Sequence, residues 1–134
     1  MSLVTVRKLL EVYLNTNSAG ISTAFENAQF TPVRGTAWQA CTLLPARAEN
    51  PTLGAGRYRQ SGVLDIALYY PTKAGTATAL GRAETLRAAF ACGTTLTENQ
   101  ITVRMLKTPS ISPGRPEGEW YVITVSVPFV VDVG

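Results

Sequence analysis

The stretch WYVITVSVPFVVDV, residues 120–133, decides the fold. Every second residue in it is apolar, and side chains of a β-strand alternate between its two faces, so these residues share one face. That face comprises Tyr121, Ile123, Val125, Val127, Phe129 and Val131. Burying it contributes on the order of 10 kcal/mol before chain entropy, at roughly 1.5–3 kcal/mol for each large side chain. The sequence therefore predicts that residues 120–133 form the strongest strand of the chain.

Weaker strand patterns precede this one. Residues 63–70 and 101–107 alternate between apolar and other side chains, as a strand with one buried face does. Residues 35–44 are rich in strand-compatible side chains and end at a proline, and residues 22–25 form the weakest pattern. Residues 101–107 and 120–133 are expected to form a long hairpin.

Two segments have helical spacing. Residues 2–15 carry an apolar stripe made of Leu3, Val6, Leu9, Leu10, Tyr13 and Leu14. Residues 76–91 carry a line of Ala79, Ala83, Leu86 and Phe90, with Arg82, Glu84 and Arg87 expected to face outward. We therefore predict one α+β domain over residues 1–134, with a single mixed or antiparallel sheet of about four to five strands and two helices packed on one face.

Two connections stand out. Residues 108–118 are rich in proline and glycine and are expected to form a hairpin loop, whereas residues 45–62 are expected to form a long loop or arm. Arginine and tyrosine are enriched at protein interfaces, so the charged and aromatic residues of the arm are predicted to contact a neighbouring subunit. These are Arg47, Glu49, Arg57, Tyr58 and Arg59. The last three would also suit stacking on single-stranded nucleic acid.

The composition argues against an enzyme. Histidine is absent, which removes the commonest general base and the commonest metal ligand. Glu117 and Glu119 form the closest acidic pair and are expected to be solvated turn residues, while the GAG sequence at 54–56 lacks the ending of a phosphate-binding loop. Cys41 and Cys92 lie far apart and are expected to be two buried free thiols. We expect no catalytic residue, no cofactor and no metal.

Charge and hydropathy limit the classes of partner that we expect for this chain. The net charge is +3. The charged fraction is 16%, below the usual quarter. This low charged fraction fits either a surface that is hidden against copies of the same chain or a surface with few charges and no special role. The sequence holds no apolar run of roughly 20 residues and no signal-peptide core. We expect cytoplasmic synthesis and no membrane partner.

The segment GRYRQSGVLDIALYYPTKAGTATALGRAETLRAAF, residues 56–90, resembles the central block of phage tail terminator proteins, the minor tail protein U family and its relatives. The order of features is similar over nearly the whole chain. An N-terminal helix precedes a strand with Trp38, followed by a basic and aromatic entry, a strand ending in proline, an alanine-rich helix ending at Phe90 and a closing hairpin.

This resemblance implies a virion structural protein of a long-tailed phage. Such a protein forms a homohexameric ring that caps the tail tube at its head-proximal end, stops tube polymerisation and provides the surface for head–tail joining. Its partners would be itself, the tail tube protein and the head–tail joining protein, with DNA passing through the ring without sequence-specific binding. The alternatives are another head–tail connector or tail tube protein, which as a tube subunit would form filaments, and a small basic nucleic-acid-binding module, whose DNA affinity would fall steeply with salt.

Overall fold

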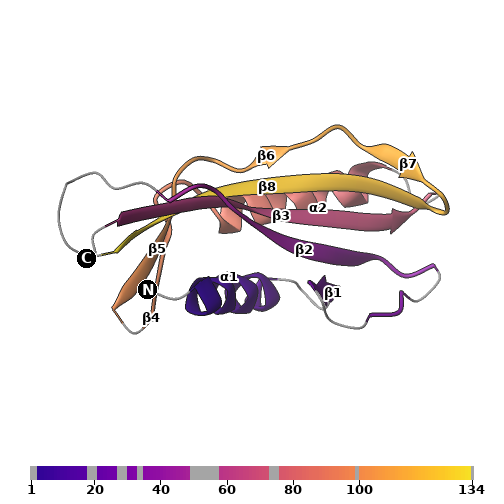
Figure 1. Ribbon diagram of the computed structural model, residues 1–134. Coiled ribbons are helices and arrows are strands. Elements are labelled where there is room, and N and C mark those ends of the chain that lie inside the picture. The colour runs from indigo at the N-terminus through magenta and orange to yellow at the C-terminus, as the bar shows by residue number, and fades with distance from the viewer. Residues whose placement is uncertain are drawn as a thin grey trace.

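The computed structural model describes residues 3–17, 21–26, 30–32, 35–48, 58–72, 76–98 and 100–133. Two helices pack against one curled β-sheet (Figure 1). In chain order the elements are α1 (Leu3–Thr16), β1 (Ser22–Phe25), β2 (Trp38–Pro45), β3 (Tyr58–Pro71), α2 (Thr76–Ala89), β4 (Thr95–Glu98), β5 (Ile101–Met105), β6 (Ser110–Ile111), β7 (Arg115–Glu117) and β8 (Trp120–Val133). Neither helix is long and apolar enough to cross a membrane, as far as the described residues extend.

The sheet is built on the pairing of its two longest strands. The path of the sheet is β1-β2-β3-β8-β5-β4, and β6 and β7 pair with β8 beside β5. Strands β3 and β8 run antiparallel along their whole length, from Tyr58 opposite Val133 to Pro71 opposite Trp120. Strand β1 pairs with β2 in parallel, so the sheet is mixed. The strand expected over residues 120–133 is confirmed with the same bounds.

The expectation of a four- to five-stranded sheet is wrong, because the described residues alone form a sheet of eight strands. Strands β4, β6 and β7 are short, and β6 and β7 fall within the expected loop at residues 108–118. Their sequences, TLTE, SI and RPE, carry no long apolar alternation. Backbone groups of any sequence can pair with an open strand edge, and β8 provides that edge here. The α+β description holds broadly, although most of the regular structure is strand.

Strand β3 also begins earlier than expected. Residues 58–62, which were expected to belong to the arm, pair with β8 instead. Gly62, the last residue of the expected arm, lies where β3 closely approaches the β2 backbone and the Phe129 ring. A Cβ there would lie 2.8 Å from the Leu44 carbonyl oxygen and 2.8 Å from Cζ of Phe129. A glycine at this position therefore reflects packing within the sheet and not a turn.

A single core lies between one face of the sheet and both helices. Alternate residues of β2, β3 and β8 face it, and the cross-strand register aligns them: Cys41 lies opposite Ile66, which lies opposite Val125. The helices contribute Val6, Leu10 and Leu14 from α1 and Ala79, Ala83, Leu86 and Phe90 from α2. The predicted packing of α2 against the apolar face of β8 is confirmed, with Tyr121 only partly buried.

The two helices also contact each other. The rings of Tyr13 and Phe90 meet edge to face at 4.9 Å between centroids. The Tyr13 hydroxyl donates a 2.6 Å hydrogen bond to the carbonyl oxygen of Ala89, at the end of α2. The helices are therefore held in a fixed relation on the inner face of the sheet.

Candidate assembly surfaces

The structure separates the five residues predicted to form a subunit interface. Tyr58 and Arg59 are the first two residues of β3, and Arg47 is exposed just after β2. Glu49 and Arg57 lie outside the described residues. The main chains of β2 and β3 continue to pair beyond Pro45, because the Ala46 amide donates to the Ser61 carbonyl oxygen. The side-chain amide of Gln60 also donates to the Ala46 carbonyl oxygen. Arg47 and Arg59 therefore lie towards the same end of the sheet.

Arg59 belongs to a charge cluster that joins three strands. Its Nε lies 2.6 Å from Oδ1 of Asp132 on β8, and Nη2 of Arg104 on β5 lies 2.9 Å from Oδ2 of the same carboxylate. The hydrogen bond from Arg59, opposed by partial desolvation, holds the pKa of Asp132 below its usual value. All three side chains are about half exposed, so each pair contributes at most about 1 kcal/mol.

An aromatic cluster occupies the opposite end of the sheet, on the face away from the core. Trp38 stacks on its cross-strand neighbour Tyr69 at 4.0 Å, and Trp120 meets Trp38 edge to face at 6.0 Å. Phe30 packs at 5.2 Å from Trp38. Burial raises the pKa of the Tyr69 phenol above its usual value. Tryptophan and tyrosine are the side chains that most often anchor protein interfaces.

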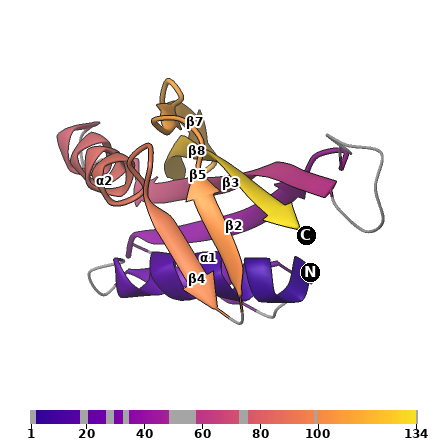
Figure 2. The same ribbon diagram turned by 90° about the vertical axis from the view of Figure 1, so that its left-hand side faces the viewer.

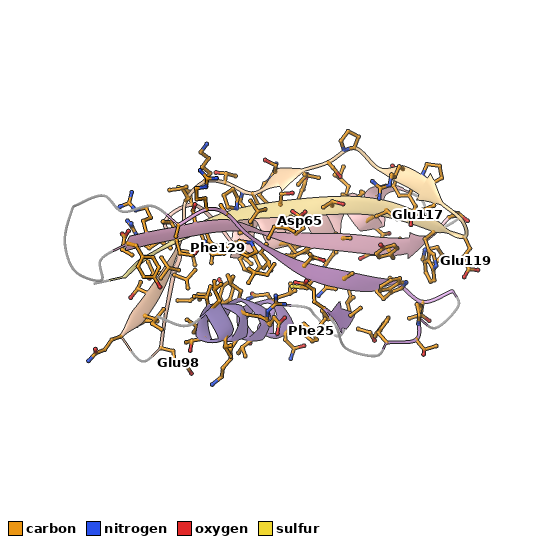
Figure 3. The ribbon with its side chains drawn as sticks, in the orientation of Figure 1. Phe25, Asp65, Glu98, Glu117, Glu119 and Phe129 are labelled. Carbon is orange, nitrogen blue, oxygen red and sulfur yellow. The ribbon has the colours of Figure 1, made fainter. Side chains whose placement is uncertain are left out.

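A groove lies between α1 and the sheet-edge strand β4. It has a volume of about 330 Å³ and is lined by Lys8, Leu9, Val12, Tyr13, Thr16, Thr95, Leu96, Thr97 and Glu98. Its exposed lining surface is mainly apolar, with Leu9, Val12, Tyr13 and Leu96 among the lining residues. At its rim, Nζ of Lys8 lies 3.2 Å from Oε1 of Glu98. Glu98 points away from the body of the domain in Figure 3. Since β4 ends the path of the sheet, the groove lies at an open sheet edge.

The residues considered for chemistry do not converge. Glu117 and Glu119 are exposed at the tip of the β7–β8 hairpin (Figure 3), and Glu117 pairs with Arg115 at 3.4 Å. In the described part of the chain, no three His, Cys, Asp or Glu residues lie close enough to hold a metal ion. The GAG sequence at 54–56 lies outside the described residues.

The prediction of two buried thiols is correct for Cys41 and wrong for Cys92. Cys41 faces the core from β2, and burial raises its pKa to about 12. Cys92 is exposed, because α2 has ended and the chain turns towards β4 at this residue. The apolar character of a cysteine side chain favours burial and gives no indication that the chain turns at Cys92.

Sequence comparison assigns this architecture to a family. The family model for phage tail terminator proteins matches residues 5–129, nearly the whole domain. The chain belongs to the phage tail terminator family. One solved structure is similar to the chain with a TM-score of 0.79 and 21% sequence identity, covering 98% of this chain and 96% of the other. At that identity the likeness shows a shared fold. No curated protein matched the sequence.

The resemblance seen in residues 56–90 is thereby confirmed at the level of the family. Tail terminators are structural proteins of the phage tail, so membership implies a place in the virion tail and contacts with other tail components. It also favours a structural role over a catalytic one. The surfaces described above are therefore best considered as contact surfaces for assembly.

Proposed function

We propose that this tail terminator forms a homohexameric ring that caps the tail tube, stops its polymerisation and provides the surface for head–tail joining. The family match over residues 5–129 is the observation that carries the proposal. A cyclic ring also requires two different contact surfaces on each subunit. The described chain offers candidates on several elements, since its large exposed apolar side chains are Leu3, Val4, Val12, Leu44, Leu80 and Leu106.

The proposed partners are other copies of the chain, the tail tube protein at one face of the ring and a head–tail joining protein at the other. DNA would pass through the ring without sequence-specific binding. We further propose that Arg47, Glu49, Arg57, Tyr58 and Arg59 lie at a contact between subunits. The ion pair of Arg59 with Asp132 supports this for Arg59, because it favours a side-chain position that is exposed at the end of the sheet.

A different tail protein, either a connector or a tube subunit, is the nearest alternative. A nucleic-acid-binding module is less well supported by the charges. Arg7, Lys8, Arg59, Arg104 and Arg115 each contact a carboxylate within the chain, so they do not form a free basic stripe.

The native mass of the purified protein separates these functions. A terminator ring gives a closed particle of six subunits of 14.4 kDa each. A tube subunit gives filaments of indefinite length, and a nucleic-acid binder gives a monomer whose DNA affinity falls steeply with salt. Light scattering and electron microscopy of the protein, alone and mixed with tail tubes, distinguish the three. If neither condition yields a closed ring, the proposal is wrong.

A further inference from the structure

Arg82 on α2 is buried without a partner. Only 8% of its surface is exposed, and it is the charged side chain that the described residues bury. Its Nε and Nη2 atoms have no hydrogen-bond partner, and no carboxylate of the described chain forms an ion pair with it. The nearby Tyr70 phenol only partly offsets the desolvation that lowers the pKa of Arg82. A buried guanidinium without a counter-charge destabilises the isolated subunit.

The neighbouring residue, Gly81, is also unexplained by the subunit itself. Glycine is less favourable than alanine in a helix, yet a Cβ at Gly81 would meet no heavy atom within 4 Å, and its φ is not in the left-handed region. The exposed residues nearest to Gly81 on the helix are small, namely Ala77, Thr78, Thr85 and Ala88. Beside them protrudes Leu80, which is 40% exposed and is flanked by Glu84 and Arg87. Such a face lets another protein approach the helix backbone closely.

The groove between α1 and β4 complements this face. It is concave and mainly apolar where α2 is convex. Glu98 at its rim is paired with the exposed Lys8 through Oε1, and a carboxylate can accept from a second cation such as Arg82. The groove reaches the C-terminal end of α2 through Tyr13, but the two surfaces belong to different parts of the domain. In Figure 2, α2 lies to the left of the sheet, whereas α1 lies below it, next to the edge strand β4. Two complementary surfaces on different sides of one chain are what a head-to-tail contact needs in order to close into a ring.

We propose that the exposed face of α2 in one copy seats in the α1–β4 groove of the next copy, with Leu80 entering the groove and Arg82 pairing with the neighbour's Glu98. Arginine has a long flexible stem, so its guanidinium can turn from Tyr70 towards the helix surface when the carboxylate arrives. This inference rests on the proposed ring and names the contact that closes it.

Substitutions at Gly81 test the α2 side of the contact. Gly81→Leu places a large side chain in open space, so the subunit should melt at or above the wild-type temperature, while its self-association should weaken at least tenfold. Gly81→Ala is the matched control, because it keeps the residue small and should leave assembly intact. Assembly of Gly81→Leu at wild-type strength would overturn the inference.

Substitutions on α1 test the groove side. Val12→Arg changes a groove-lining residue that is 57% exposed, so it should leave the fold intact and prevent assembly. Val4→Arg is the matched control, since Val4 is 77% exposed on the same helix and does not line the groove. Loss of assembly in both variants, or in neither, would contradict the groove as the receiving surface.

Mixing the two defective variants gives the sharpest result. Gly81→Leu retains the groove and Val12→Arg retains α2, so each alone should remain monomeric whereas the mixture should form a one-to-one dimer and no ring. A mixture that stays monomeric, or that forms rings, would overturn the head-to-tail contact.

The charge pairing has its own test. Arg82→Met should raise the melting temperature of the isolated subunit and weaken assembly, and combining it with Glu98→Gln should weaken assembly no further than either change alone. Additive effects would exclude the Arg82–Glu98 pair.

The behaviour of the wild-type chain separates the two proposals. If the wild-type chain forms no ring, either alone or on tubes, the proposed function fails. If the wild-type chain forms rings and all these variants form them too, only the proposed contact fails.

Discussion

Replacement of Gly62 by alanine tests how closely β3 packs on the core. The added Cβ would lie 2.8 Å from the Leu44 carbonyl oxygen and 2.8 Å from Cζ of Phe129. The first atom belongs to the paired backbone of β2 and the second to a fully buried ring, so neither can move without disturbing the sheet or the core. Overpacking of this kind costs about 1–3 kcal/mol. At about 4 °C per kcal/mol for a domain of this size, the melting temperature should fall by roughly 4–12 °C.

Thermal and urea unfolding followed by circular dichroism measure this effect, with Gly81→Ala as the matched control. The same chemical change at Gly81 meets open space, so it should stabilise the protein by about 0.5–1 kcal/mol through helix propensity alone. Adding Phe129→Leu to Gly62→Ala should recover only part of the loss, because the contact with the Leu44 carbonyl remains. A Gly62→Ala variant as stable as the wild type would refute the close approach of β3 to Phe129.

Three other changes probe the core, the charge cluster and the thiols. Val125→Asp places an unpaired charge where the side chain is fully buried, so no cooperative unfolding transition should remain; a folded variant with wild-type near-ultraviolet circular dichroism would contradict the core. Because the pKa of Asp132 is lowered by folding, its ionised form stabilises the protein at neutral pH, and this contribution should be lost as the pH falls from the usual carboxyl range towards the lowered pKa. The difference in melting temperature between wild type and Asp132→Asn should therefore be largest near neutral pH and disappear in acid; a difference that does not change with pH would exclude the ion pairs as its source. In the native protein, a thiol reagent should modify exposed Cys92 within minutes and Cys41 only after unfolding, and equal labelling rates would show that Cys41 is not buried.

The sequence predicts those parts of the fold that apolar periodicity determines. Strand β8 and the core-facing line of α2 follow from side-chain spacing alone, and both are found where expected. Strands β6 and β7 could not be predicted, because their pairing uses backbone groups against the edge of β8. The register that brings Arg59 to Asp132 is likewise set by the alignment of β3 with β8, which no local pattern reports.

Arg82 shows why contact surfaces are harder to predict than cores. Its charge favoured a solvent-facing position, but it is spaced three residues after Ala79 and four before Leu86, on the same side of the helix as both. The structure buries it with them. At this position the helical spacing indicates the side that the residue faces, and the charge of the side chain does not. A residue that breaks the apolar pattern without a partner in its own chain is a signal worth testing at other candidate interfaces.

Tube length measured by electron microscopy tests the central claim most directly. Tails assembled with this protein should end in an additional ring at one end and have a narrow distribution of lengths. Tails assembled without it, from the same tube protein, should lack the ring and continue to grow to variable and greater lengths. Identical length distributions with and without the protein would contradict its role as the terminator of tube polymerisation.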